Sequence, residues 1–252
     1  MKILLTNDDG INSRGIQKLA ELLRVKGHKV FVIAPDANRS GISNAISILN
    51  NPVKIFKLEE DTWSCSGYPA DCVIAGVMAV LAEKPDLVLS GINQGANLGT
   101  DLIYSGTAAA ARQASIGDIP AVALSLAGNA EFFWDMAAAW SVDHLEELVS
   151  FWRKDSFVNV NIPNSPDPPA GLVLTRPALK NYQDIVKTIT APDGSLWCFL
   201  VHGQESIVEE EGTDCDAVSK KLAAVSLIYN YPVLGPIGPN DKKEQGIAYG
   251  GG

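Results

Sequence analysis

A chain of 252 residues with 46% hydrophobic and 19% charged residues has the composition of a globular protein with a sizeable core, which excludes the disordered and fibrous classes. Its formal net charge of −9 argues against nucleic acid or an anionic membrane as a partner. An anionic small molecule would have to be bound by a local device, such as a cation, an arginine or a helix N-terminus.

The first part of the chain alternates short apolar runs with helical patterns. Strands are expected at 2–6, 29–35, 86–91, 121–126 and 157–162, and 46–50 and 53–58 are expected as a hairpin or as two strands beside the main sheet. Helices are expected at 13–26, 70–83 and 105–114, with one long amphipathic helix over 131–153. Strands that are apolar on both faces and alternate with helices are typical of a mostly parallel sheet flanked by helices, so the predicted fold class is α/β.

The character of the sequence changes after Pro163, where four prolines crowd one connection. Short strand-like runs follow, and we expect them to form hairpins in an appended lobe that packs against another subunit: 171–175, 184–190, 195–203 and 223–235. We therefore expect a core over 1–165 and a C-terminal extension over 166–252, which serves oligomerisation and ends in a mobile tail. The polar run 212–217 is expected to be a loop.

The chain opens with its first expected strand and shows neither a basic-then-apolar leader nor an apolar run of membrane-spanning length. Its four cysteines have neither C-x-x-C spacing nor the density of a disulfide framework: Cys65, Cys72, Cys198 and Cys215. We therefore expect a soluble cytoplasmic protein with reduced thiols.

Polar loops follow three of the expected strands, at the edge where open parallel sheets bind ligands. The first strand runs into Asn7, Asp8 and Asp9, the second into the loop 35–45, and the third into the segment 90–107. None of these loops contains a histidine or a cysteine. Oxygen ligands without nitrogen or sulfur are typical of a site for Mg²⁺, Mn²⁺ or Ca²⁺.

Each loop taken alone has a plainer interpretation. Asn-Asp-Asp-Gly is good turn chemistry, and Asp9 is a candidate helix cap. Ser105, Gly106 and Thr107 open a helix whose free N–H groups favour an anion such as phosphate, although Ser and Thr are also ordinary caps. The coincidence of three oxygen-rich loops at one edge favours a binding site.

In their order and spacing, four motifs resemble the stationary-phase survival protein SurE family: NDDG at 7–10, APDANRSGISNA at 34–45, GYPADCV at 67–73, and SGINQGANLG with YSGT over 90–107. The resemblance implies a Rossmann-like N-terminal domain and a C-terminal part used in dimer and tetramer assembly. It also implies a divalent-metal-dependent phosphatase of the 5'-nucleotidase type. Such an enzyme acts on nucleoside 5'- and 3'-monophosphates and, in some members, on polyphosphate.

The resemblance also implies roles for single residues. One divalent cation, Mg²⁺ or Mn²⁺ with Ca²⁺ as a substitute in crystals, is expected on two adjacent aspartates, a serine and an asparagine: Asp8, Asp9, Ser40 and Asn93. The two aspartates are also the candidate catalytic residues. The candidates for binding phosphate or substrate are Asn7, Arg39, Asn97, Ser105, Gly106 and Thr107.

The sequence departs from the family pattern at Tyr68, where the family usually has Thr, and over 111–113. A small-molecule nucleotide is the expected substrate, and a homodimer or homotetramer the expected assembly. The alternatives are a non-catalytic metal- or nucleotide-binding module, an exopolyphosphatase as the main activity, and a metal-dependent glycosyltransferase. A dinucleotide oxidoreductase is disfavoured because the first turn is NDDG and not a G-x-G-x-x-G loop.

Overall fold

The structure is a computed structural model that describes residues 1–128, 131–201, 203, 205–207 and 210–232. The predicted C-terminal tail lies outside these residues, as do the last three residues of the run 223–235. Among the described residues, no helix is both long and apolar enough to cross a lipid bilayer.

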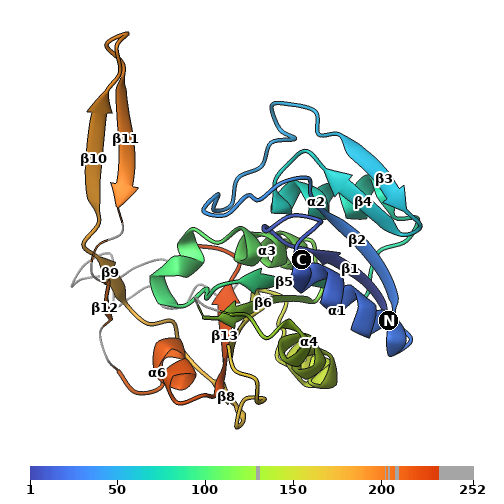
Figure 1. The fold of residues 1–252 in the computed structure, drawn as a ribbon. Coiled ribbons are helices and arrows are strands. Elements are labelled where there is room, and N and C mark those ends of the chain that lie inside the picture. Colours follow the sequence, from blue (N-terminus) through green and yellow to red (C-terminus); the bar gives the residue numbers. More distant parts are fainter. Residues whose placement is uncertain (129–130, 202, 204, 208–209, 233–252) are drawn as a thin grey trace, which may run out of the picture.

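The centre of the fold is a nine-stranded sheet with the strand order β3-β4-β2-β1-β5-β6-β7-β13-β8 (Figure 1). Neighbouring strands are parallel except for the pairs β3–β4 and β7–β13. The prediction of an α/β fold with a mostly parallel sheet is therefore confirmed. The strands are β1 (Lys2–Thr6), β2 (Lys29–Pro35), β3 (Ile55–Glu59), β4 (Thr62–Cys65), β5 (Leu87–Gln94), β6 (Ala121–Ala127), β7 (Ser156–Pro163), β8 (Leu172–Leu174) and β13 (Ala223–Tyr229).

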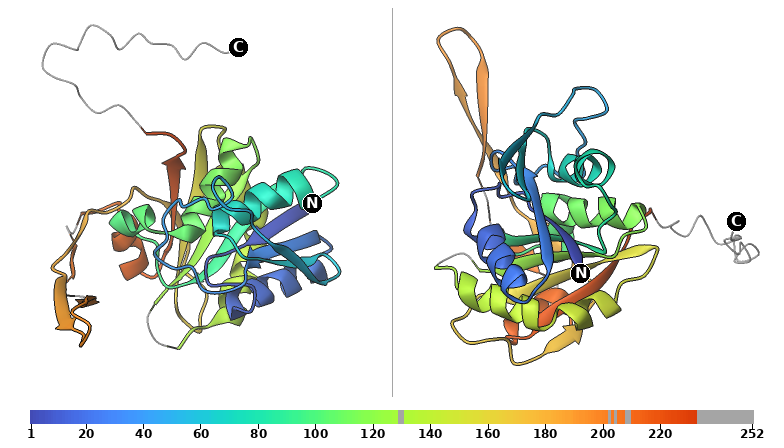
Figure 2. Two further views of the ribbon diagram at one scale, coloured as in Figure 1. Left: turned by 90° about the horizontal axis from the view of Figure 1, so that it is seen from above. Right: turned by 90° about the vertical axis from the view of Figure 1, so that its right-hand side faces the viewer.

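Helices cover both faces of this sheet (Figure 2). One face carries α1 (Arg14–Val25), α4 (Trp134–Asp143) and α5 (Leu145–Ser150), and the other carries α2 (Pro69–Ala75) and α3 (Gly106–Ile116). Along β1, Ile3 and Leu5 join the core under α1, whereas Leu4 joins the core under α2 and α3. The central strands are apolar on both sides because helices cover both of their faces.

Residues 46–50 form turns instead of the predicted strand, because a buried carboxylate takes their backbone N–H groups. Asp71 on α2 accepts hydrogen bonds from the N–H of Ser47 at 2.9 Å and of Ile48 at 3.0 Å. It also accepts the N–H of Tyr68 at 2.9 Å, at the start of its own helix. A single side chain thus fixes the long loop between β2 and β3 on α2.

The helix predicted over 131–153 begins only at Trp134, and it is interrupted at His144 between α4 and α5. The His144 ring stacks on Trp140 with centroids 4.4 Å apart. Its Nδ1 lies 2.9 Å from the Trp140 carbonyl oxygen, so side chain and backbone share one acceptor at the break.

Two other predicted elements differ from the structure. The helix predicted over 70–83 is α-helical only to Ala75 and continues as a π-helical turn, η1 (Gly76–Val80). The predicted loop 212–217 contains the start of a helix, α6 (Asp214–Ser219). The Thr213 hydroxyl caps α6 by accepting the Asp216 N–H at 3.3 Å, which is ordinary N-cap chemistry.

Two of the runs expected in hairpins of an appended lobe, 171–175 and the described part of 223–235, instead join the central sheet as β8 and β13, where β13 pairs with β7 and β8. Other segments beyond residue 166 form two separate ribbons. In the first ribbon, β9 (Lys180–Tyr182) pairs with β12 (Glu205–Ile207). In the second, β10 (Ile185–Thr190) pairs with β11 (Leu196–Val201). The β10–β11 hairpin projects away from the sheet in Figure 1 and in the right-hand view of Figure 2.

Helix α1 lies so close to β5 that only glycine fits at residue 15. A Cβ on Gly15 would lie 2.1 Å from the Ile92 carbonyl oxygen and 2.9 Å from Cζ3 of Trp134. We expect Gly15→Ala to lower the free energy of unfolding by about 3 kcal/mol, because helix and strand must move apart. Urea denaturation followed by circular dichroism measures the change. Gln17→Ala, on the exposed side of α1, should cost no more than about 0.5 kcal/mol, and equal stability of the two variants would contradict the expectation.

Candidate active site

The turn after β1 is closed by the side chain of Asn7. Its Oδ1 accepts the Gly10 N–H at 3.1 Å, and its Nδ2 donates to the Gly10 carbonyl oxygen at 3.0 Å and to the Ser13 hydroxyl at 2.7 Å. Gly10 has φ +99°, a conformation that favours glycine. The Asn7 side-chain amide therefore stabilises the turn that contains Asp8 and Asp9, and it makes its hydrogen bonds to Gly10 and Ser13 within this turn.

Asp8 lies against the N-terminus of α3 and is only 3% exposed. Its Oδ1 accepts the Thr107 hydroxyl at 2.6 Å, and its Oδ2 accepts the Thr107 N–H at 3.2 Å. A Cβ on Gly106 would lie 2.8 Å from the Cβ of Asp8, so the approach needs a glycine there. The Asp8 carbonyl oxygen also accepts the Arg39 N–H at 2.7 Å. The loops after β1, β2 and β5 thus meet at Asp8.

Asp9 faces the end of β5, where its Oδ2 accepts the Gln94 N–H at 2.9 Å. The pKa of Asp9 is raised to about 6, mainly by burial. The hydrogen bond from the Gln94 N–H opposes this rise, and the charge of neighbouring Asp8 adds to it. Burial also raises the pKa of Asp8, against the hydrogen bonds from Thr107. Both carboxylates are therefore disfavoured in their charged form, and a cation between them would remove that cost.

The remaining candidate metal ligands are neutral oxygen donors. Asn93 is buried on β5, and its Nδ2 donates to the Gly95 carbonyl oxygen at 3.0 Å. Ser40 is exposed, and its backbone N–H donates to Oδ1 of Asn38 at 2.8 Å. Within the described part of the chain, the Ser40 hydroxyl, Oδ1 of Asn93 and Oδ1 of Asp9 make no hydrogen bond.

The donor set fits a hard divalent cation. It contains two carboxylates and two neutral oxygens, which are ligand types that Mg²⁺ and Mn²⁺ prefer. Among the described residues there is no group of three or more His, Cys, Asp or Glu side chains that could hold a metal, so any metal here would need Ser or Asn oxygens or water.

The guanidinium group of Arg39 is directed to its own loop. It forms an ion pair with Asp36 at 2.9 Å, donates to the Ser66 carbonyl oxygen at 3.3 Å and lies over the Tyr68 ring at 5.9 Å. The structure brings the Arg39 backbone, but not a guanidinium contact, to the paired aspartates.

Asn97 is held by β6 and β7 through side chains that the sequence did not single out. Its N–H donates to Oδ1 of Asn161 at 2.8 Å and its Nδ2 to the Ser125 hydroxyl at 2.8 Å. Its carbonyl oxygen accepts the amides of Asn159 at 3.1 Å and Asn161 at 3.0 Å. The sequence did contain a signal for this network: Asn159 and Asn161 alternate with apolar residues in the buried strand FVNVNI, and buried amides need hydrogen-bond partners.

Ser105 acts as the N-cap of α3, since its hydroxyl accepts the Ala108 N–H at 3.0 Å. Gly106 and Thr107 form the first turn of that helix and face Asp8. The positive end of the α3 dipole therefore lies beside the paired carboxylates, at the same edge of the sheet.

A second buried carboxylate, Asp214 on α6, fixes the segment between Asn97 and Ser105. Asp214 is fully buried and accepts the N–H of Gly99 at 2.7 Å and of Ala178 at 2.9 Å. The sequence alone indicates no role for the run GTD at 212–214. In the structure, its aspartate anchors the segment before Ser105.

Beside Asp214, the 3₁₀ turn η2 (Gly99–Ile103) is tied to β9. The Lys180 ammonium group lies 2.6 Å from Oδ2 of Asp101, and the Tyr182 hydroxyl donates to the same carboxylate. The loop that leads into α3 is thus anchored on the C-terminal part of the chain.

These features define a class of protein, the α/β proteins with an open, mostly parallel sheet. At the carboxyl ends of its strands, this one places paired aspartates and other oxygen donors beside a helix N-terminus. Comparison with known proteins then gives the family. The family described as survival protein SurE matches residues 3–184. The chain belongs to the SurE family, which confirms the resemblance found in the sequence.

Individual relatives are similar in sequence to nearly the whole chain. The 5'-nucleotidase SurE of Pelobacter propionicus is 39% identical over 235 residues, which cover 91% of this chain and 93% of that protein. The 5'-nucleotidase SurE of Geobacter sulfurreducens is 38% identical over 233 residues, covering 91% and 88%. The crystal structure of the SurE protein from Aquifex aeolicus superposes with a TM-score of 0.80 at 35% identity and covers 92% of this chain and 95% of that one.

The anchoring of the 99–103 turn by Asp214 can be measured. In Asp214→Asn the amide cannot accept every N–H that the carboxylate accepts, so a buried donor is left unsatisfied. We expect a loss of about 1–3 kcal/mol in the free energy of unfolding, with faster amide hydrogen exchange over 97–105. Asp167→Asn, at an exposed position, is the control. Unchanged exchange over 97–105 would show that Asp214 does not anchor this turn.

Proposed function

We propose that this protein is a divalent-metal-dependent phosphomonoesterase that hydrolyses nucleoside 5'-monophosphates, and also 3'-monophosphates, to nucleoside and phosphate. The observation that carries the proposal is the pair of adjacent aspartates, of which Asp8 is buried against the N-terminus of α3 and Asp9 faces the end of β5. Membership of the SurE family and relatives named 5'-nucleotidase SurE support the same activity.

One cation, Mg²⁺ or Mn²⁺, would be held by the oxygens of two aspartates, a serine and an asparagine: Asp8, Asp9, Ser40 and Asn93. When bound, such an ion supplies positive charge to the phosphoryl oxygens and lowers the pKa of a coordinated water. Within the described loops at this edge, oxygens that make no hydrogen bond, such as Oδ1 of Asp9, are available to it.

The residues of the chain itself position and stabilise the phosphate. The first turn of α3 directs its dipole at the site, so an anion bound beside Gly106 and Thr107 is favoured. Thr107 keeps the Asp8 carboxylate in one orientation by donating two hydrogen bonds to it. The hydrogen bonds of Asn97 to β6 and β7 would keep the loop between β5 and α3 rigid, which is the preorganisation that charge redistribution in phosphoryl transfer requires.

Hydrolysis can be separated from binding by one assay. Phosphate release from AMP and from p-nitrophenyl phosphate should require Mn²⁺ or Mg²⁺ and stop with EDTA. Asp8→Asn should lower kcat/KM at least about 100-fold, because a charged ligand is lost from the site. Asp118→Asn, beyond the far end of α3, should retain full activity.

Two of the rival functions predict different results of this assay. Metal-dependent AMP binding without phosphate release would indicate a binding module. Faster release from polyphosphate than from AMP would make exopolyphosphatase the main activity.

The β10–β11 hairpin supports assembly as a homodimer or homotetramer. Cross-strand pairing puts Ile189 and Trp197 on one face with Ile185 and Phe199, and each of these side chains is about half exposed or more. An isolated two-stranded hairpin is marginally stable in water, so we propose that a second copy of the chain covers this face.

Assembly through the hairpin is tested by disrupting its apolar face. We expect Trp197→Asp combined with Ile189→Asp to convert the oligomer to a monomer in light scattering after size exclusion. A charged side chain cannot be buried there without a partner. Thr188→Asp, which puts a charge on the opposite face of the same hairpin, is the matched control, and an unchanged mass of the double variant would place the interface elsewhere.

A further inference from the structure

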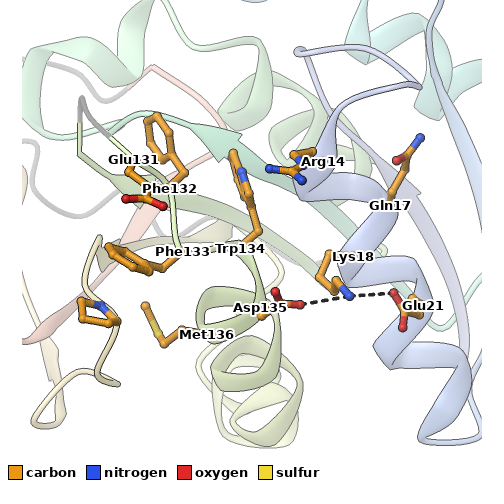
Figure 3. A pocket seen from close by; sticks show the side chains of 11 residues that line it. Arg14, Gln17, Lys18, Glu21, Glu131, Phe132, Phe133, Trp134, Asp135 and Met136 are labelled. Carbon is orange, nitrogen blue, oxygen red and sulfur yellow. Dashed lines mark ion pairs between the residues drawn. The ribbon is translucent and has the colours of Figure 1, made fainter.

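A cavity of about 590 Å³ opens between α1 and the segment 131–136 (Figure 3). The side chains that matter here are Arg14 from α1 and Phe132 and Trp134 from the segment that follows β6. That volume lies in the range of small-molecule sites.

This cavity and the candidate active site lie at the same edge of the sheet. The segment 131–136 lies beyond the carboxyl end of β6, the edge at which the paired aspartates stand. The edge of the Trp134 ring lies against Gly15, where α1 touches the carbonyl group of Ile92. Ile92 directly precedes Asn93 on β5, so the contact between Trp134 and Gly15 lies next to a candidate metal ligand.

An aromatic surface forms one wall of the cavity. The Phe132 and Trp134 rings are stacked with centroids 5.2 Å apart and planes 21° apart, and both residues are half-buried. Aromatic faces held in this way are platforms on which a nucleobase stacks.

The two ends of the cavity differ in their charge partners. At one end, Lys18 pairs with Glu21 at 2.9 Å and with Asp135 at 3.0 Å, so the charge there is neutralised within the protein. At the other end, Arg14 lies near Trp134 (Figure 3) and makes no hydrogen bond or ion pair within the described residues. Its donors are therefore available to a ligand.

We propose that this cavity is the nucleobase subsite of the enzyme and that it favours purines, an inference that rests on the function proposed above. The base would stack on the Phe132–Trp134 surface, and Arg14 would donate to acceptors on its edge. Guanine offers O6 and N7 and adenine offers N7, which are acceptors that arginine commonly binds. The larger ring system of a purine also covers more of the aromatic surface.

The test compares substrates with and without a base. In Phe132→Leu and in Arg14→Gln, we expect KM for GMP to rise about tenfold with kcat nearly unchanged, the size of effect expected for a lost stacking or edge contact. KM for ribose 5-phosphate, which has no aromatic ring to stack, should stay the same. Glu60→Gln, at an exposed position outside the cavity, is the control and should leave both substrates unaffected.

The other outcomes overturn the proposal. Unchanged KM for GMP in both variants would exclude base contacts, and an equal rise for GMP and ribose 5-phosphate would indicate a structural role only. If the unaltered protein hydrolyses neither substrate, the proposed function fails separately, and calorimetric titration with guanosine decides the subsite. Binding that both variants weaken would then support it, and absence of binding would overturn it.

Discussion

The contact between Asp8 and the first turn of α3 is the interaction on which the arrangement of the site depends. It joins the end of β1 to the loop after β5, and the Arg39 N–H bound to the Asp8 backbone adds the loop after β2. Gly106 permits this contact because a side chain there would meet Asp8. A buried carboxylate is stable so close to a helix only where N–H and O–H donors, or a cation, compensate its charge.

Other loops around the site are also held by a buried aspartate that accepts backbone N–H groups. Asp71 binds the amides of Ser47 and Ile48, and Asp214 binds those of Gly99 and Ala178. Loops rich in glycine and small polar residues have few apolar side chains to bury, so packing alone would order them weakly. Hydrogen bonds to charged acceptors are about twice as strong as neutral ones and supply that order instead.

The sequence was sufficient to predict those elements whose structure depends on a local pattern of residues. Strands such as 29–35 and 121–126 are apolar on both faces, and this property alone indicates a sheet covered on both sides. It was insufficient where distant residues decide. The run 46–50 has strand-forming residues, but Asp71 takes its amides, and the Asn97 network depends on strands that lie side by side only in the fold. The cavity lined by Trp134 could not be foreseen either, because it depends on where the helix over 131–153 begins.

The tie between η2 and β9 connects the candidate site to the hairpin that we propose as the interface between copies. Lys180 and Tyr182 hold Asp101 in the loop that leads into α3, and three residues after Tyr182 the chain enters the hairpin. In that proposed assembly, a hairpin separated from its partner copy would lose the contacts that order it, and β9 would then hold the turn before Ser105 less firmly. Turnover per chain would then decline on dilution, although no residue of the hairpin lies among the paired aspartates and their hydrogen-bond partners.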